Sequence, residues 1–270
     1  MMKNSGMVVL PALQAELSAA TNRLLATAAS LSDADLAAPS LLPGWTRGHV
    51  LAHVAQNAGS HLNLLAWART GVRTPQYASL QARATAIEAA AARPVARHLA
   101  DIEEGAARVA AAVRDMPGEC WSAQVEGMRP PPHPAWYLLV RRLREIGFHH
   151  VDLDAGYGPA DWPEPFVARE LHDCRACWPR DGGTVSEIVL KGSGGGILAR
   201  WPRLGSGPAV EGAPAAMLAW LTGRSGGEGV TLVHVGRLPT PEPAALPAPP
   251  AWLTATAPAD LPATPPEDYP

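Results

Sequence analysis

The chain has 270 residues, of which 47% are hydrophobic and 17% are charged, and its formal net charge is −3. This composition is typical of a globular protein with room for two modest domains, and it excludes an intrinsically disordered chain. The small net charge disfavours electrostatic binding to nucleic acid or to anionic lipid, so we expect neither as a partner. The sequence shows neither a signal-peptide pattern nor a run of about 18 apolar residues, and we therefore expect a cytoplasmic protein.

Helical spacing of apolar residues dominates the first part of the chain. Leucines recur at this spacing over 8–30, and a second helix is predicted to begin after the N-cap Thr46 and to run towards Gly71. Further helices are predicted over 79–92, from Pro94 to about 116, and from Pro134 to Gly156. Long helices joined by moderate loops indicate an antiparallel four-helix bundle, so we predict a helical domain over 1–160.

The composition changes after this region. A helix over about 164–178, strands in "SEIVLKG" and "GILARW", a helix in "APAAMLAWLTGR" capped by Gly223 and a strand in "GVTLVHVG" follow in that order. This order predicts a small α+β domain over 161–238, which makes the fold class α plus α+β. The remaining residues, 239–270, hold 11 of the 28 prolines and have almost no periodicity, so we predict an extended or disordered tail.

The three cysteines do not point to a redox or metal function. Cys174 and Cys177 form "CRAC", but no second CxxC pair completes a four-cysteine site and no βαβ pattern precedes this pair. Cys120 stands alone. We therefore expect plain, reduced thiols.

Two histidine-containing segments carry the candidate chemistry. In "RRLREIGFHHVDLD", Glu145 and His149 are four residues apart and share one face of the predicted helix, together with Arg142 and Asp152. A polar stripe of this kind faces either water or the bundle interior, where metals are usually held. A histidine from "HVLAH", at 49–53, would complete two imidazoles and one carboxylate, the ligand set of a catalytic zinc site. The spacing alone also fits solvated helix faces, and it leaves the choice between neighbouring histidines open.

Two long motifs resemble those of a known family. "LLPGWTRGHVLAHVAQNAGSHLNLLAWARTG" and "REIGFHHVDLDAGYGPADWP" are similar to segments of the mycothiol-dependent maleylpyruvate isomerases, which belong to the DinB-like metal-binding bundles. The resemblance covers residues 8–238 and leaves out the proline-rich tail. It implies a zinc ion held by His53, Glu145 and His149, and it makes His49 a wall residue one turn before the ligand.

The resemblance also implies two substrate-binding arginines. The family places an arginine of the second domain over the metal, and Arg224 in "AWLTGR" fits that position as a catalytic and substrate-binding residue. An arginine after a helix end also complements the helix dipole, which is the structural alternative. Arg83 falls where the family has an arginine followed by acidic residues, but Ala84 and Thr85 follow it here, which weakens the implied role in substrate binding.

The implied reaction is the cis–trans isomerisation of 3-maleylpyruvate to 3-fumarylpyruvate in gentisate breakdown, with mycothiol as the thiol cofactor. A conjugated cis double bond rotates only after a nucleophile adds to it, and the attacking species is a thiolate, which zinc stabilises. Rotation and elimination of the thiolate then give the trans isomer. The substrate is a small dicarboxylate, for which arginine offers bidentate recognition.

Two other functions remain open at this point. A mycothiol S-transferase would use the same zinc-bound thiolate on another electrophile, and a non-catalytic binding module would hold the metal for structural reasons. Thiol-dependent turnover separates an enzyme from a module, and the identity of the product separates isomerase from transferase. In each case we expect a monomer.

Overall fold

The structure is a computed structural model that describes residues 9–179, 181, 183–233, 245–251 and 253–270. The chain divides into two compact units, the first reaching to Gly158 and including Ala259–Tyr269, the second comprising Pro159–Pro258. The domain bounds expected from the sequence, 1–160, 161–238 and 239–270, stay a prediction.

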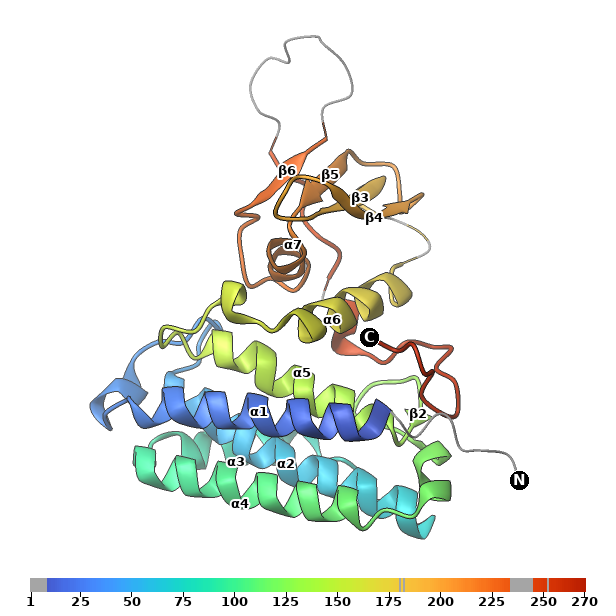
Figure 1. Cartoon of the computed structure of the whole chain (residues 1–270). Helices are drawn as coiled ribbons and strands as arrows, with labels where there is room; N and C mark the ends of the chain where they lie inside the picture. The colour runs from blue at the N-terminus through green and yellow to red at the C-terminus, as the bar shows by residue number, and fades with distance from the viewer. Residues whose placement is uncertain (1–8, 180, 182, 234–244, 252) are drawn as a thin grey trace. The chain divides into compact units, whose positions relative to one another are not determined.

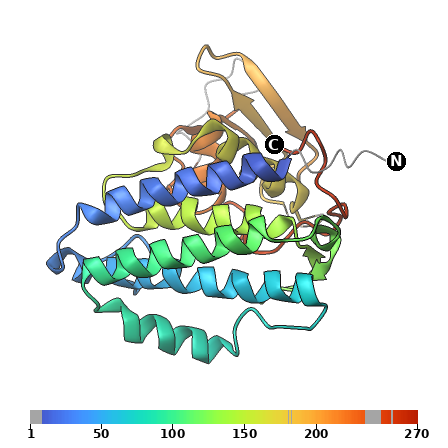
Figure 2. The same ribbon diagram turned by 60° about the horizontal axis from the view of Figure 1, so that its bottom comes forward.

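The first unit is a helical bundle. Its α-helices are α1 (Val9–Ala29), α2 (Arg47–Thr70), α3 (Leu80–Ala91), α4 (Val95–Arg114) and α5 (Tyr137–Asp152). Figures 1 and 2 show α1, α2, α4 and α5 lying side by side, with α3 against α2. Both α1 and α2 pack on α4 and on α5, so α1 and α2 occupy opposite corners of the bundle. The α2–α5 seam and the α1–α4 seam therefore lie on opposite sides.

The start of α2 is determined by local sequence. The side chain of Thr46 accepts a hydrogen bond from the backbone N–H of His49, and Nδ1 of the His49 ring accepts one from the backbone N–H of Thr46, which closes a capping box. At the other end, Gly71 adopts a left-handed conformation with φ 72°, which ends the helix as its sequence predicts.

The last bundle helix is shorter than the sequence predicts. It begins at Tyr137 rather than Pro134 and ends at Asp152 rather than near Gly156. Pro134 instead belongs to the two-residue strand β2 (His133–Pro134), which pairs antiparallel with β1 (Gln124–Val125). The backbone N–H groups of Ala135 and Trp136 donate to carbonyls of residues 123 and 121. Because these hydrogen bonds continue the contact between the two segments, the helix begins only after them.

The second unit is a small α+β domain, which confirms the predicted fold class. It contains α6 (Glu164–Ala176), β3 (Glu187–Lys191), β4 (Ile197–Pro202), β5 (Ala209–Gly212), α7 (Pro214–Leu221) and β6 (Val230–Leu232). The strand order is β4-β3-β5-β6, with β3 and β5 parallel and the other neighbours antiparallel. β5 was not predicted, because the four residues of this strand carry too short an alternation. The last residues of the strand expected in "GVTLVHVG" lie outside the described residues.

The described part of the tail has little regular structure beyond a single 3₁₀ turn, Leu253–Ala255, but several of its side chains are buried. In the first unit the tail contacts the start of α5. The indole N–H of Trp136 donates to the carbonyl of Pro262 at 2.9 Å, and the ring of Tyr269 lies edge-on to Trp136 at 5.2 Å.

Among the described residues, no helix combines the length and the apolar character that crossing a membrane requires.

Candidate metal centre

The structure brings His53, Glu145 and His149 together at the seam between α2 and α5. One ligand atom from each residue lies within 4.8 Å of the others, the only such group of potential metal ligands in the described parts of the chain. The Oε2 atom of Glu145 lies 3.0 Å from Nε2 of His53 and 3.4 Å from Nε2 of His149. Both histidines are buried, and Glu145 is partly exposed.

The histidine rings are held in place by packing and by further polar partners. They lie edge-to-face with their centroids 4.6 Å apart, and Trp45 packs edge-on against His53 at 5.6 Å. Nδ1 of His149 donates to the buried carboxylate of Asp152 at 2.9 Å. This contact keeps Nε2 directed at Glu145, which is the usual arrangement of a carboxylate behind a metal-binding histidine.

The other face of His53 contacts an arginine. Nη2 of Arg83, on α3, lies 3.2 Å from Nδ1 of His53. Because a guanidinium only donates, Nδ1 accepts this hydrogen bond, and the ring proton is on Nε2, which donates to Glu145. The guanidinium also lies over the ring of Tyr77, at 5.8 Å from its centroid.

The protonation states follow from these contacts. Burial lowers the pKa of His53 to about 4, although its hydrogen bond to Glu145 opposes the shift, so this ring is neutral at pH 7. Burial alone would raise the pKa of Glu145, but hydrogen bonds from His149 and His53 hold it well below its usual range. Burial opposes protonation of His149, but the hydrogen bonds to Asp152 and Glu145 outweigh it and raise the pKa of His149.

These donors fit a divalent metal ion such as zinc. Two imidazole nitrogens and one carboxylate oxygen converge from two helices, with a second carboxylate behind one imidazole. Three protein ligands leave a tetrahedral zinc ion one position for an exogenous group, as in catalytic sites.

The neighbouring histidines have other roles. Nε2 of His49 lies 3.0 Å from Glu88, and its Nδ1 belongs to the capping box, so its role in the structure is helix capping. His150 contacts the hydroxyl of Thr27 on α1 and stacks on Tyr157 with ring centroids 3.6 Å apart. The structure therefore settles which histidine of each segment faces Glu145.

The remaining candidate residues lie in different places. Arg83 is adjacent to the trio, despite the unusual residues that follow it. Arg224 belongs to the second unit, where its guanidinium donates to the carbonyl of Thr222 at 2.7 Å, and its role in the site stays a prediction. The three cysteines are free thiols and are not part of the trio.

Sequence reasoning overlooked the positions of Asp152 and Arg83 around the imidazoles. Asp152 was part of the predicted polar stripe, and its spacing of three residues from His149 is the signal that identifies it as that histidine's partner. The contact of Arg83 depends on how α3 packs on α2, for which the sequence carries no signal.

Comparison with known proteins agrees with this geometry. The family model described as "Mycothiol maleylpyruvate isomerase N-terminal domain" matches residues 17–154, about half of the 270-residue chain and the part that contains all three trio residues. The chain belongs to this family of isomerases. No curated protein sequence matches it.

Two solved structures are similar over most of the chain. One is the crystal structure of a mycothiol-dependent maleylpyruvate isomerase, with 28% sequence identity and a TM-score of 0.78, covering 93% of this chain and all of that one. The other is a histidine-to-alanine mutant of such an isomerase, with 27% identity, a TM-score of 0.77 and the same coverage. The likeness therefore extends beyond the helical bundle to the α+β unit of this family member.

Proposed function

We propose that this family member isomerises 3-maleylpyruvate to 3-fumarylpyruvate, with zinc and mycothiol, by addition of the thiol, rotation and elimination. The observation that carries the proposal is the convergence of His53, Glu145 and His149 within 4.8 Å in a member of this isomerase family. A bound zinc ion would supply the positive charge that keeps a thiol ionised at neutral pH.

The residues of the chain would prepare this site in three ways. Nε2 of each histidine and the carboxylate of Glu145 hold the metal, while Asp152 keeps the proton of His149 on Nδ1. When Nε2 of His53 binds the metal, the proton of this ring belongs on Nδ1, where Arg83 can no longer donate to it. The guanidinium of Arg83 is then released for a carboxylate of the substrate.

Arg224 is proposed as the second carboxylate-binding residue and as a catalytic residue. We expect Arg224→Lys to keep the fold and the metal but to lose most of the activity, because an ammonium does not reproduce the bidentate fork of arginine. Circular dichroism and metal analysis check the first half of this expectation, and kcat/KM checks the second. A kcat/KM close to that of the wild type would contradict a role for Arg224 in the reaction.

One assay tests the function itself. Metal-loaded protein is incubated with maleylpyruvate, with and without mycothiol, and both the product spectrum and the free thiol are followed. We expect fumarylpyruvate to form only with mycothiol, with the thiol recovered unchanged. Consumption of one thiol per product would indicate the transferase instead, and absence of turnover under both conditions would indicate a binding module.

The wider setting is part of the same proposal. We propose a monomeric, cytoplasmic enzyme whose partners are the dicarboxylate substrate and the thiol cofactor, with no role in nucleic-acid or membrane binding. Size-exclusion chromatography with light scattering tests the monomer.

A further inference from the structure

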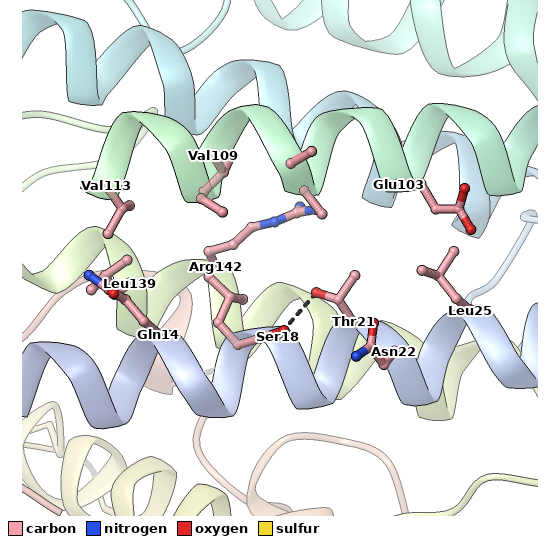
Figure 3. A pocket seen from close by; sticks show the side chains of 14 residues that line it. Gln14, Ser18, Thr21, Asn22, Leu25, Glu103, Val109, Val113, Leu139 and Arg142 are labelled. Carbon is pink, nitrogen blue, oxygen red and sulfur yellow. Dashed lines mark hydrogen bonds between the residues drawn. The ribbon is translucent and has the colours of Figure 1, made fainter. Parts of the chain in front are cut away.

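A cavity lies in the bundle, away from the metal trio. It has a volume of about 280 Å³ and is lined by residues of α1, α4 and α5 only (Figure 3). None of the trio lines it, and no residue of α2 does. Since the α1–α4 seam is opposite the α2–α5 seam, this cavity, the α1–α4 groove, is separate from the site described above.

The interior of the groove carries a buried positive charge. Arg142 of α5 is only 2% exposed, and Figure 3 shows its side chain reaching between α1 and α4. Its Nη1 donates to the carbonyl of Val54 at 2.9 Å and to Oδ1 of Asn57 at 2.6 Å. Its Nη2 is buried without an acceptor, and no carboxylate among the described residues forms an ion pair with it.

An arrangement of this kind is costly unless something occupies it. Burial lowers the pKa of Arg142 to about 10, although the charge of Glu145 partly opposes this shift, so the group is still cationic at neutral pH. A buried charge is normally paired, and an unsatisfied donor loses the hydrogen bonds that water would supply. The nitrogen without an acceptor is one of those through which arginine binds a carboxylate.

The rest of the lining limits the chemistry of the occupant. Leu17, Val109, Val113 and Leu139 present aliphatic surface to the groove, which suits a hydrocarbon chain. The lining also includes neutral polar side chains of α1, but no second cation. Glu103 also lines the groove, but its side chain is exposed. Its negative charge therefore disfavours an anion at the surface of the groove. The volume is slightly below the range for drug-sized ligands, roughly 300–1,000 Å³, which limits the occupant to a small molecule.

We propose that the α1–α4 groove is a second ligand site, which binds a small aliphatic monocarboxylate with its carboxylate on Nη2 of Arg142. The chain of the ligand lies on the four aliphatic residues. The proposal is independent of the function proposed for the metal centre.

Binding of hexanoate to the wild-type protein tests this site. A chelator is present throughout, so that a carboxylate bound to metal is not counted, and affinity is measured by titration followed by NMR. Hexanamide, which has the same chain without the charge, is the matched control ligand. We expect hexanoate to bind at least ten times more tightly than hexanamide. Equal affinities, or no binding of hexanoate, would overturn the proposal.

Variants locate the binding. Arg142→Met is expected to abolish the preference for hexanoate. Because this variant also loses the contacts to α2, Ala107→Phe provides a second test: Ala107 is exposed and lines the groove, so phenylalanine there fills the groove without disturbing the core. Ala100→Phe, an exposed alanine of α4 outside the lining, is the control. Binding lost in Ala107→Phe and kept in Ala100→Phe supports the site, whereas binding kept in both refutes it.

Discussion

His149 is the residue whose proton a metal ion has to displace. Its pKa is raised, while the pKa of His53 is lowered to about 4 and that of Glu145 is held well below its usual range. Above the pKa of His149 all three ligands are ready to bind, and below it a proton competes with the metal. We therefore expect metal affinity to be constant at high pH and to fall about tenfold per pH unit below the pKa of His149.

Competition with a chelator at a series of pH values measures this slope. Asp152→Asn removes the carboxylate that stabilises the His149 proton, so the fall should begin at lower pH. The same variant should bind metal roughly 10–100 times more weakly at high pH, because the orientation of the ring is lost. A slope of two protons per metal would show that His53 is also protonated.

Arg83 is expected to oppose metal binding in the absence of substrate. Nη2 of its guanidinium is 3.2 Å from Nδ1 of His53, so its positive charge repels the incoming cation. Its N–H also donates to Nδ1, the atom that has to carry the ring proton when Nε2 binds the metal. We expect Arg83→Met to raise metal affinity by roughly 1 kcal/mol, about fivefold. Calorimetric titration of zinc into both proteins measures this, with Arg83→Lys as the variant that keeps the charge. A lower affinity in Arg83→Met would mean that Arg83 supports the site.

At the scale of elements, the packing of α3 on α2 depends on Gly48. A Cβ atom at this position would lie 2.1 Å from the carbonyl oxygen of Ala91, the last residue of α3. We expect Gly48→Ala to lower the free energy of unfolding by about 1–3 kcal/mol, the usual cost of overpacking. Because α3 carries Arg83, the contact of this residue with His53 should also be disturbed.

A second glycine of the same helix provides the control. A Cβ at Gly59 has no atom within 4 Å, so Gly59→Ala should stabilise the helix by roughly 0.5–1 kcal/mol. Urea denaturation of the two variants measures both effects. Equal effects of the two substitutions would show that α3 moves away from α2 without cost.

For the whole molecule, buried neutral histidines predict loss of stability in mild acid. Burial lowers the pKa of both His61 and His133 to about 3 and also lowers that of His98. The unfolded chain binds protons on these rings below about pH 6.5, and the folded protein does not, so stability falls as the pH drops from 6.5. By pH 5.5 each fully buried ring should remove about 1.4 kcal/mol. The raised pKa of His149 acts in the opposite direction and reduces the total.

Urea denaturation of the metal-free protein at pH 7.5 and pH 5.5 measures this loss. His61→Gln removes one titrating ring while keeping a donor for the carbonyl of Asn57, which the ring contacts at 3.0 Å. The difference in stability between the two pH values should therefore shrink by about 1.4 kcal/mol in this variant. An unchanged difference would mean that His61 does not drive the acid sensitivity.

The sequence by itself determined the features that depend on neighbouring residues. Thr46 and Gly71 bound α2 because a side-chain cap and a left-handed glycine act within one turn of the helix. The four-residue spacing of Glu145 and His149 placed both on one helix face, and the family motifs added His53. Their roles as ligands stay a prediction, although the structure brings their atoms together. The α plus α+β fold class followed from the order of these local patterns.

Only the tertiary structure decided what depends on contacts between distant segments. β5 exists because β3 and β6 pair with it from both sides, and α5 starts late because β2 pairs with β1. Residues of the tail that lack any periodic pattern are ordered by contacts such as the one between Trp136 and Pro262. In the same way, Arg83 reaches His53 through the packing of α3, and Arg142 reaches the α1–α4 groove from a helix that also carries Glu145 and His149. Such contacts join residues tens of positions apart, and their energies come from burial and geometry that no local spacing encodes.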